Sequence, residues 1–90
     1  MPSYTPRSRA CQQELNDRIR ALRRRIGHNI HTARAARRLS LKKCAALCGL
    51  HMETLDRFEI GGGEINLYHL AILSQALNTD ISQLIETKQE

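Results

Sequence analysis

The stretch Ser40–Phe58, which reads SLKKCAALCGLHMETLDRF, decides the fold of this chain. Ser40 is a favourable N-cap residue and predicts a short helix over residues 41–47 or 41–48. Gly49 predicts a sharp stop, because glycine adopts the left-handed backbone conformation at little cost. A second short helix is expected from near His51 to about Ile60. Two short helices joined through a glycine turn are typical of a helix-turn-helix.

Small or apolar side chains stand where these two helices must touch. They are Ala45, Cys48, Leu50, Leu55 and Phe58. Ala45 in particular is small enough to let the second helix cross closely.

The segment before the motif has the pattern of a basic helix from Arg9 to Arg38. Apolar residues recur in it at spacings of three and four, the period of an amphipathic helix. They are Leu15, Ile19, Leu22, Ile26, Ile30 and Ala33. Gly27 leaves two possibilities open: two helices that meet near it, or one long helix that carries it. Ser8 is the expected N-cap, and residues 1–8 are expected to form an irregular arm.

Two further helices are predicted after the motif. Gly61–Gly63 forms an open turn, and Asn66 begins the next helix. Its expected buried side consists of Leu67, Leu70, Leu73, Ala76 and Leu77. Asp80 caps a last helix that runs through Glu86. The residues of this helix expected to point inward are Ile81, Leu84 and Ile85. No strand pattern is visible, so the fold class is all-α.

Charge is distributed unevenly along the 90 residues, whose net charge is +5. Residues 1–43 carry twelve Arg and Lys against two acids, a net +10, whereas residues 44–90 carry two against seven, a net −5. A basic half of this kind favours a polyanionic partner such as nucleic acid. A solvated helix surface is the simpler alternative.

The composition disfavours several classes of protein. No run of about 18 apolar residues exists, so no membrane span is expected, and no signal peptide is visible. Three cysteines are an odd number, which does not describe a disulfide framework, and we expect a cytoplasmic protein. No nucleophile occurs with a recognisable base motif, and the glycine run follows a helix instead of a strand. We therefore expect neither an enzyme nor a cofactor.

From Ile26 to Ile85 the sequence resembles the lambda-repressor/Cro-like family, also called the xenobiotic-response-element family. The resemblance rests on four stretches: IGHNIHTAR from Ile26, AALCGLH from Ala45, LDRFEIG from Leu55 and LAILSQALNTDISQLI from Leu70. It implies five helices, of which the third enters the major groove of DNA, and two-fold operators that are bound by a dimer.

Carried over position by position, the resemblance implies a recognition helix that begins at His51. The residues it implies for base contact are His51, Met52, Glu53, Thr54, Asp56 and Arg57. Arg57 suits a guanine edge, and the acids suit cytosine N4. Leu55 and Phe58 face the core, and Glu59 has a structural role.

The chain departs from the family pattern in ways that reduce its contacts to DNA. Leu41 stands where many members have glutamine, Gly62-Gly63-Glu64 replaces a loop rich in Lys and Arg, and Ile65 replaces its proline. Phosphate attraction must then come from cations elsewhere in the chain. The candidates are Arg34, Arg37, Arg38, Lys42 and Lys43 beside the motif, and Arg23, Arg24 and Arg25 before it.

The segment before Arg25 is an extension to the family's core. Three interpretations of its arginines stay open: contact with DNA, the outer face of a dimerising helix, or binding to an acidic protein or RNA. We rank phosphate contact first. The apolar stripe formed by Leu15, Ile19 and Leu22 is expected to pack between subunits.

Cys44, Cys48 and His51 stand at spacings that one helical face could present to a metal. Tetrahedral zinc needs a fourth ligand, and no second Cys/His pair lies nearby, so we interpret both cysteines as small core residues and expect no metal site.

The sequence therefore predicts three regions: a basic arm and helical extension (1–24), a helix-turn-helix DNA-binding domain (25–87) and a tail (88–90). The predicted function is a bacterial or phage transcription regulator, a repressor that binds an inverted repeat in double-stranded DNA as a homodimer. The alternative is a protein-interaction module or antitoxin-like accessory regulator, with a protein partner docked on the extension.

Overall fold

The computed structural model describes residues 8–86, and these form five α-helices and no strand. In chain order the helices are α1 (Arg9–Ala36), α2 (Leu41–Cys48), α3 (Met52–Glu59), α4 (Leu67–Leu77) and α5 (Ile81–Leu84). This confirms the all-helical prediction. The expected arm before Ser8 and the tail after residue 87 lie outside the described residues.

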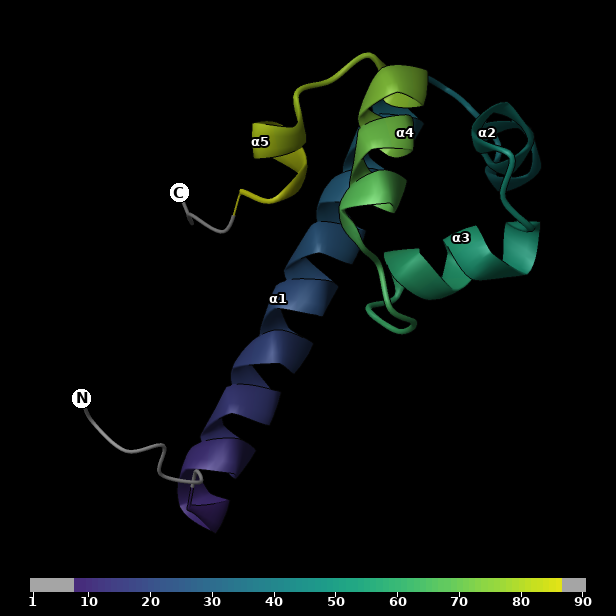
Figure 1. Ribbon diagram of the computed structural model, residues 1–90. Coiled ribbons are helices and arrows are strands. Elements are labelled where there is room, and N and C mark those ends of the chain that lie inside the picture. The colour runs from purple at the N-terminus through teal and green to yellow at the C-terminus, as the bar shows by residue number, and fades with distance from the viewer. Residues whose placement is uncertain (1–7, 87–90) are drawn as a thin grey trace.

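The first helix is a single rod of 28 residues, about 42 Å long at 1.5 Å per residue. This decides between the two possibilities left open at Gly27, because the helix continues through it. Ser8 caps its start as predicted, with its hydroxyl accepting from the Cys11 amide at 3.1 Å. The N-terminal half of α1 projects away from the other four helices, whereas its C-terminal half lies among them (Figure 1).

Gly27 fixes the place where α1 crosses the end of α3. A Cβ atom at this position would lie 2.3 Å from the carbonyl oxygen of Phe58 and 2.7 Å from that of Glu59. Both distances are too short for any side chain, and the atoms belong to backbone that cannot easily move. The absence of a side chain at Gly27 therefore sets how closely the two helices approach.

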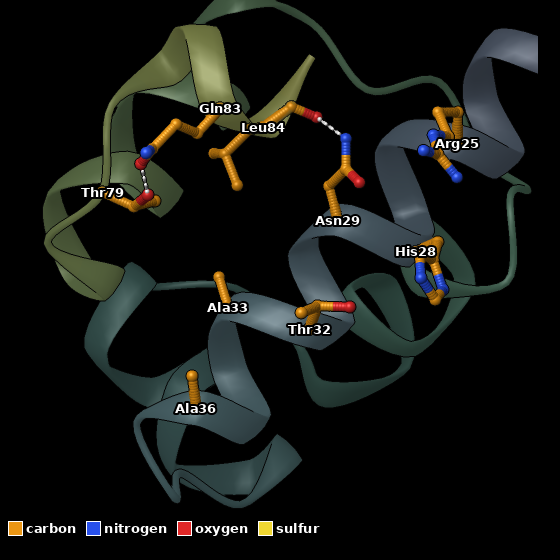
Figure 2. Close-up of a pocket in the computed structure, with 9 residues that line it drawn as sticks. All are labelled: Arg25, His28, Asn29, Thr32, Ala33, Ala36, Thr79, Gln83 and Leu84. Atoms are coloured by element: carbon orange, nitrogen blue, oxygen red, sulfur yellow. Dashed lines mark hydrogen bonds between the residues drawn. The ribbon is translucent and has the colours of Figure 1, made fainter. Parts of the chain in front are cut away.

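The core is formed by all five helices. It consists of Ile30, Cys44, Ala45, Leu55, Leu70, Leu73, Leu77 and Leu84. The short α5 is held on α1 by Asn29, whose amide donates to the Leu84 carbonyl at 2.9 Å (Figure 2). It also donates to the Glu86 carbonyl at 2.9 Å. These contacts bring the C-terminal end of the described chain onto the C-terminal half of α1.

Three details of the sequence prediction were wrong. Leu67 is 76% exposed, because it is the first residue of α4 and lies beyond the end of the core. Ile85 is 44% exposed, and the last helix ends at Leu84 instead of continuing to Glu86.

Within residues 8–86, no helix combines the length and the apolar character that crossing a bilayer requires.

Candidate nucleic-acid interface

The helices α2 and α3 form a helix-turn-helix as the motif predicted. The Ser40 hydroxyl accepts from the Lys43 amide at 3.0 Å and begins α2. Gly49 ends it with φ +70°, the left-handed conformation expected for this position. The Leu50 amide then donates to the Ala45 carbonyl at 2.9 Å, which closes the turn before α3. The orientation of α3 is thus set by backbone geometry at the turn.

The helix α3 has one buried face and one exposed face. Leu55 and Phe58 point into the protein, as expected. Of the residues predicted to contact bases, all are exposed except Thr54, which is half-buried between the two faces. The exposed ones are His51, Met52, Glu53, Asp56 and Arg57. The fold therefore brings the predicted base contacts onto one continuous surface, and their roles stay predictions.

The cations beside the motif lie around the start of α2. Lys42 and Lys43 are exposed in its first turn, and Arg37 and Arg38 are exposed in the turn that precedes it. Arg38 has φ +56°, so the chain reverses sharply there. Arg37 donates to the Asn78 carbonyl at 3.3 Å. These four side chains remain accessible to a phosphate.

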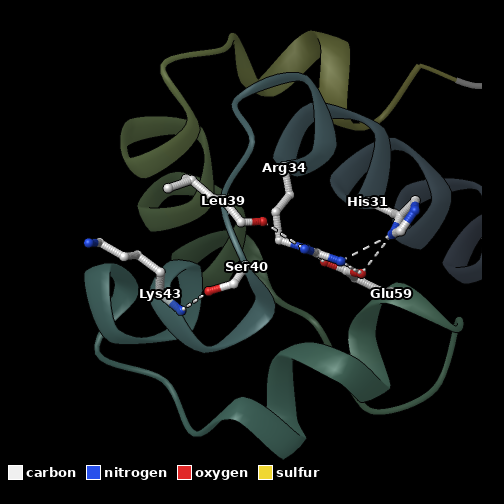
Figure 3. Close-up of polar contacts among 6 residues, drawn as sticks. All are labelled: His31, Arg34, Leu39, Ser40, Lys43 and Glu59. Carbon is white, nitrogen blue, oxygen red and sulfur yellow. Dashed lines mark hydrogen bonds and ion pairs between the residues drawn. The ribbon is translucent and has the colours of Figure 1, made fainter.

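Arg34 is placed differently, because its guanidinium is directed into the protein. It donates to both carboxylate oxygens of Glu59, from Nε at 2.6 Å and from Nη2 at 3.0 Å, and to the Leu39 carbonyl at 2.8 Å (Figure 3). His31 approaches the same carboxylate at 3.0 Å. These contacts occupy the Arg34 guanidinium, so Arg34 is not available to a DNA phosphate as the exposed cations are.

Glu59 has the structural role expected for it, since it ties the end of α3 to α1. Its side chain is only 7% exposed. Burial alone would raise the pKa of Glu59, but the hydrogen bonds and charges of Arg34 and His31 outweigh burial and lower this pKa below its ordinary value. The same hydrogen bond to Glu59 raises the pKa of Arg34. The pair is therefore ionised at neutral pH, and it stabilises the position of the candidate recognition helix.

The glycine loop, Gly61–Gly63, is less open than expected. The Gly61 and Gly62 amides donate to the carbonyls of Phe58 and Arg57 at 3.1 and 2.8 Å. These two amides are thus occupied by the last turn of α3. Arginine side chains cover the loop instead, with Arg24 against Gly61 and Arg57 against Gly62 and Gly63.

The apolar stripe on the extension is only partly covered. Leu15 and Ile19 are half-buried, and Leu22 is 47% exposed. Next to this stripe, the Arg23 guanidinium lies 3.9 Å from the Glu64 carboxylate in an exposed ion pair. Dimer contact through the stripe stays a prediction.

The cysteines of the motif are core residues, as interpreted. Cys44 is fully buried, and burial raises the pKa of its thiol. Burial, reinforced by Cys44, raises the pKa of Cys48 to about 11. His51 belongs to the turn after α2, so the three side chains do not share a helical face. Among residues 8–86 no group of three His, Cys, Asp or Glu side chains is placed to hold a metal ion.

No protein-family model and no curated protein matches the sequence. A solved structure does match. It is the restriction-modification controller protein C.AhdI from Aeromonas hydrophila, with a TM-score of 0.67 and 26% sequence identity. The match covers 69% of this chain and 94% of that chain. The helix-turn-helix fold is therefore shared with a controller protein nearly in full, while about a third of this chain lies outside the shared part.

Proposed function

We propose that this chain is a DNA-binding transcription regulator that inserts α3 into the major groove. The observation that carries the proposal is the surface of α3, where the polar and charged side chains of one face are exposed, together with the exposed cations at the start of α2, the helix that packs on α3. An α-helix fits the major groove, where each base pair presents a distinct set of donors and acceptors. The likeness to a controller protein supports a regulatory role.

The proposal divides the interface into two kinds of contact. Met52, Glu53 and Arg57 are assigned to base edges, and the cations around the start of α2 to phosphates. The latter are Arg37, Arg38, Lys42 and Lys43. Phosphate contacts set affinity and its salt dependence, whereas base contacts set sequence preference. This division lets each residue be tested by the property it controls.

We further propose that the protein acts as a homodimer on an inverted repeat and represses transcription. The exposed stripe at Leu22 supports a subunit contact, because a half-exposed apolar row on a projecting helix gains by being covered. Sedimentation velocity tests the assembly directly. A monomer at concentrations where the protein saturates its site would exclude the homodimer.

The test of DNA binding is fluorescence anisotropy with the duplex upstream of the protein's own gene and with a scrambled duplex, at about 50 and 200 mM salt, between which nonspecific phosphate binding should collapse. We expect a preference of about 100-fold for the native duplex that survives the higher salt, within the range of specific over nonspecific binding. Equal binding that vanishes at the higher salt would exclude specific readout.

Arg57→Ala separates the two kinds of contact within α3. If Arg57 reads a base, its loss should cost about 1–3 kcal/mol and relax the preference at one position of the site. A uniform loss over all sequences would assign Arg57 to a phosphate instead. Competition with single-base variants of the duplex measures the difference.

A protein-interaction module remains the second candidate function. It is favoured by the acids Glu53 and Asp56 on the exposed face of α3, which repel phosphates. In that case the extension would dock on a protein partner. The absence of specific DNA binding in the anisotropy test would select this candidate.

A further inference from the structure

We propose that a recess between α1 and the glycine loop is a seat for a DNA-backbone phosphate, outside the major groove that α3 enters. The inference rests on the proposed function and adds to it a second point of contact. The recess has a volume of about 480 Å³ and is lined by Asn16, Ile19, Arg20, Arg23 and Gly61. Two guanidinium groups and one amide thus line a hollow that a phosphate group can enter.

The recess depends on how closely the loop approaches the helix. A Cβ atom at Gly61 would lie 2.5 Å from Cγ and 3.0 Å from Cα of Arg24. Gly61 also has φ +90°, which a residue with a side chain rarely adopts. The loop can therefore lie against α1 only with glycine at this position, and the close approach places Arg24 in contact with Gly61, one of the residues that line the recess.

The positive charge around the recess comes from α1, because the loop contributes no cation. Residues 61–66 read GGGEIN and contain no cation. The amides of Gly61 and Gly62 are already bonded to α3, so they are not available to an anion. Arg20, Arg23 and Arg24 must then supply the attraction to phosphate, and guanidinium groups match phosphate oxygens in two-point geometry.

Two carboxylates contact these arginines in the free protein, and both contacts are weak. Asp17 lies 3.1 Å from Arg20, with both side chains more than half exposed. Glu64 is 92% exposed and lies 3.9 Å from Arg23. Exposed ion pairs of this kind contribute little to stability, so a phosphate can replace either carboxylate as the partner of its arginine.

The recess is joined to the exposed face of α3 through Arg57. The side chain of Arg57 lies against Gly62 and Gly63, with its Cδ 3.4 Å from the Cβ position of Gly63. The loop that carries these glycines leads from the end of α3 to α4 (Figure 1), and its Gly61 lies against Arg24 of α1. A duplex held on α3 therefore has its flanking backbone at the loop and the arginines behind it.

The experiment compares Arg20→Gln, Arg23→Gln and Arg24→Gln with the matched control Arg18→Gln. Arg18 is an exposed arginine of the same helix that does not line the recess. One lost phosphate contact lowers the salt slope by about 0.9, which amounts to about a 5-fold loss of affinity at 0.15 M salt. We expect this loss for the recess variants, less than about 2-fold for the control, and an unchanged sequence preference.

Glu64→Gln provides the opposite change, since it releases Arg23 and removes a charge that repels phosphate. Its affinity should rise by about 2-fold. Circular dichroism on every variant checks that α1 remains helical. If the three recess variants match Arg18→Gln in affinity and slope, the recess is not a phosphate seat.

The two proposals fail separately in this design. Equal binding of native and scrambled duplexes by the unmodified protein contradicts specific regulation, yet the variants still measure backbone contact on either duplex. If the unmodified protein binds specifically but the recess variants keep its affinity and salt slope, only the phosphate seat is contradicted. Hydroxyl-radical footprinting adds a positional test: we expect protection of backbone outside the α3 site, and we expect it to be lost when Arg20, Arg23 and Arg24 are all replaced by Gln in one protein.

Discussion

The two halves of α1 have the same backbone and very different surroundings. Ile30, in the C-terminal half, is fully buried among helices α2 to α5, whereas Ile19, three turns earlier, is only half-buried beside the glycine loop. Both isoleucines belong to the same apolar stripe in the sequence. The comparison shows that periodicity marks which face of a helix is apolar, but not whether another element covers that face.

The N-terminal half persists as a helix through local contacts and through its continuity with the anchored half. A helix of this length alone is marginal in water, because the first turn is costly to form. Here Ser8 caps the start, and side chains four residues apart are bonded, with Gln12 to Asn16 at 3.3 Å and Gln13 to Asp17 at 3.1 Å. The anchored half provides the nucleus that the extension continues.

The largest expected effect is on the free energy of unfolding, when one isoleucine in each half of α1 is replaced by alanine. Ile30→Ala should lower the free energy of unfolding by about 4 kcal/mol, because it leaves a cavity in the core. Ile19→Ala should lower it by less than about 0.5 kcal/mol in the monomer, because Ile19 is only half-buried and its loss leaves no enclosed cavity. Urea denaturation at a concentration where sedimentation shows monomers measures both. Similar losses for the two variants would mean that the extension is covered in solution.

A smaller effect is expected at the ion pair that joins the anchored half to α3. Arg34→Ala should cost about 2 kcal/mol, because it leaves the Glu59 carboxylate buried without its main partner. Arg20→Ala, which breaks the exposed pair with Asp17, is the control and should cost less than about 0.5 kcal/mol.

The same pair predicts an acid dependence of stability. The pKa of Glu59 is lowered in the folded protein, so its contribution is present above its ordinary pKa of 4.5 and is lost as pH falls through the lower, folded value. We expect unfolding free energy to decrease in this window, and Glu59→Gln to remove that part of the decrease. A variant with an unchanged acid profile would show that other carboxylates are responsible.

The smallest expected effect is a difference in how readily the three cysteine thiols are alkylated. Cys11 is exposed on the extension, Cys44 is buried, and Cys48 has a pKa of about 11. At pH 8 only about one in a thousand Cys48 thiols is then ionised, and the thiolate is the reactive form. Mass spectrometry after brief iodoacetamide treatment should find one label, on Cys11, and three labels in denaturant. Early labelling of Cys48 would show that the core opens readily.

Much of the fold could be predicted because its signals are local. Ser8, Ser40, Asn66 and Asp80 all precede helices as N-caps, and Gly49 ends one. A cap or a left-handed glycine depends on a few neighbouring residues, which sequence displays directly. Leu67 was missed because its exposure depends on where the core ends, which is a property of the assembled helices.

The candidate interface was predictable only in part for the same reason. The turn at Gly49 fixes where α3 begins, so the residues on its exposed face could be assigned from the sequence. Arg34 could not be told from its basic neighbours, because its partner Glu59 stands 25 residues further along the chain. The packing of Arg24 on Gly61 likewise joins two distant segments, and no local pattern indicates it.

Because Gly27 fixes where α1 crosses α3, the number of residues that precede it in α1 decides which way the side chains of the extension point. Each residue of an α-helix turns the chain by 100° and advances it by about 1.5 Å. Deletion of one residue between Arg20 and Gly27 would swing every preceding side chain by that angle, moving the arginines away from the glycine loop. The extension should therefore tolerate many changes of residue type, whereas insertions and deletions should be selected against. Natural variation should then preserve the rotational register of this helix more than its composition.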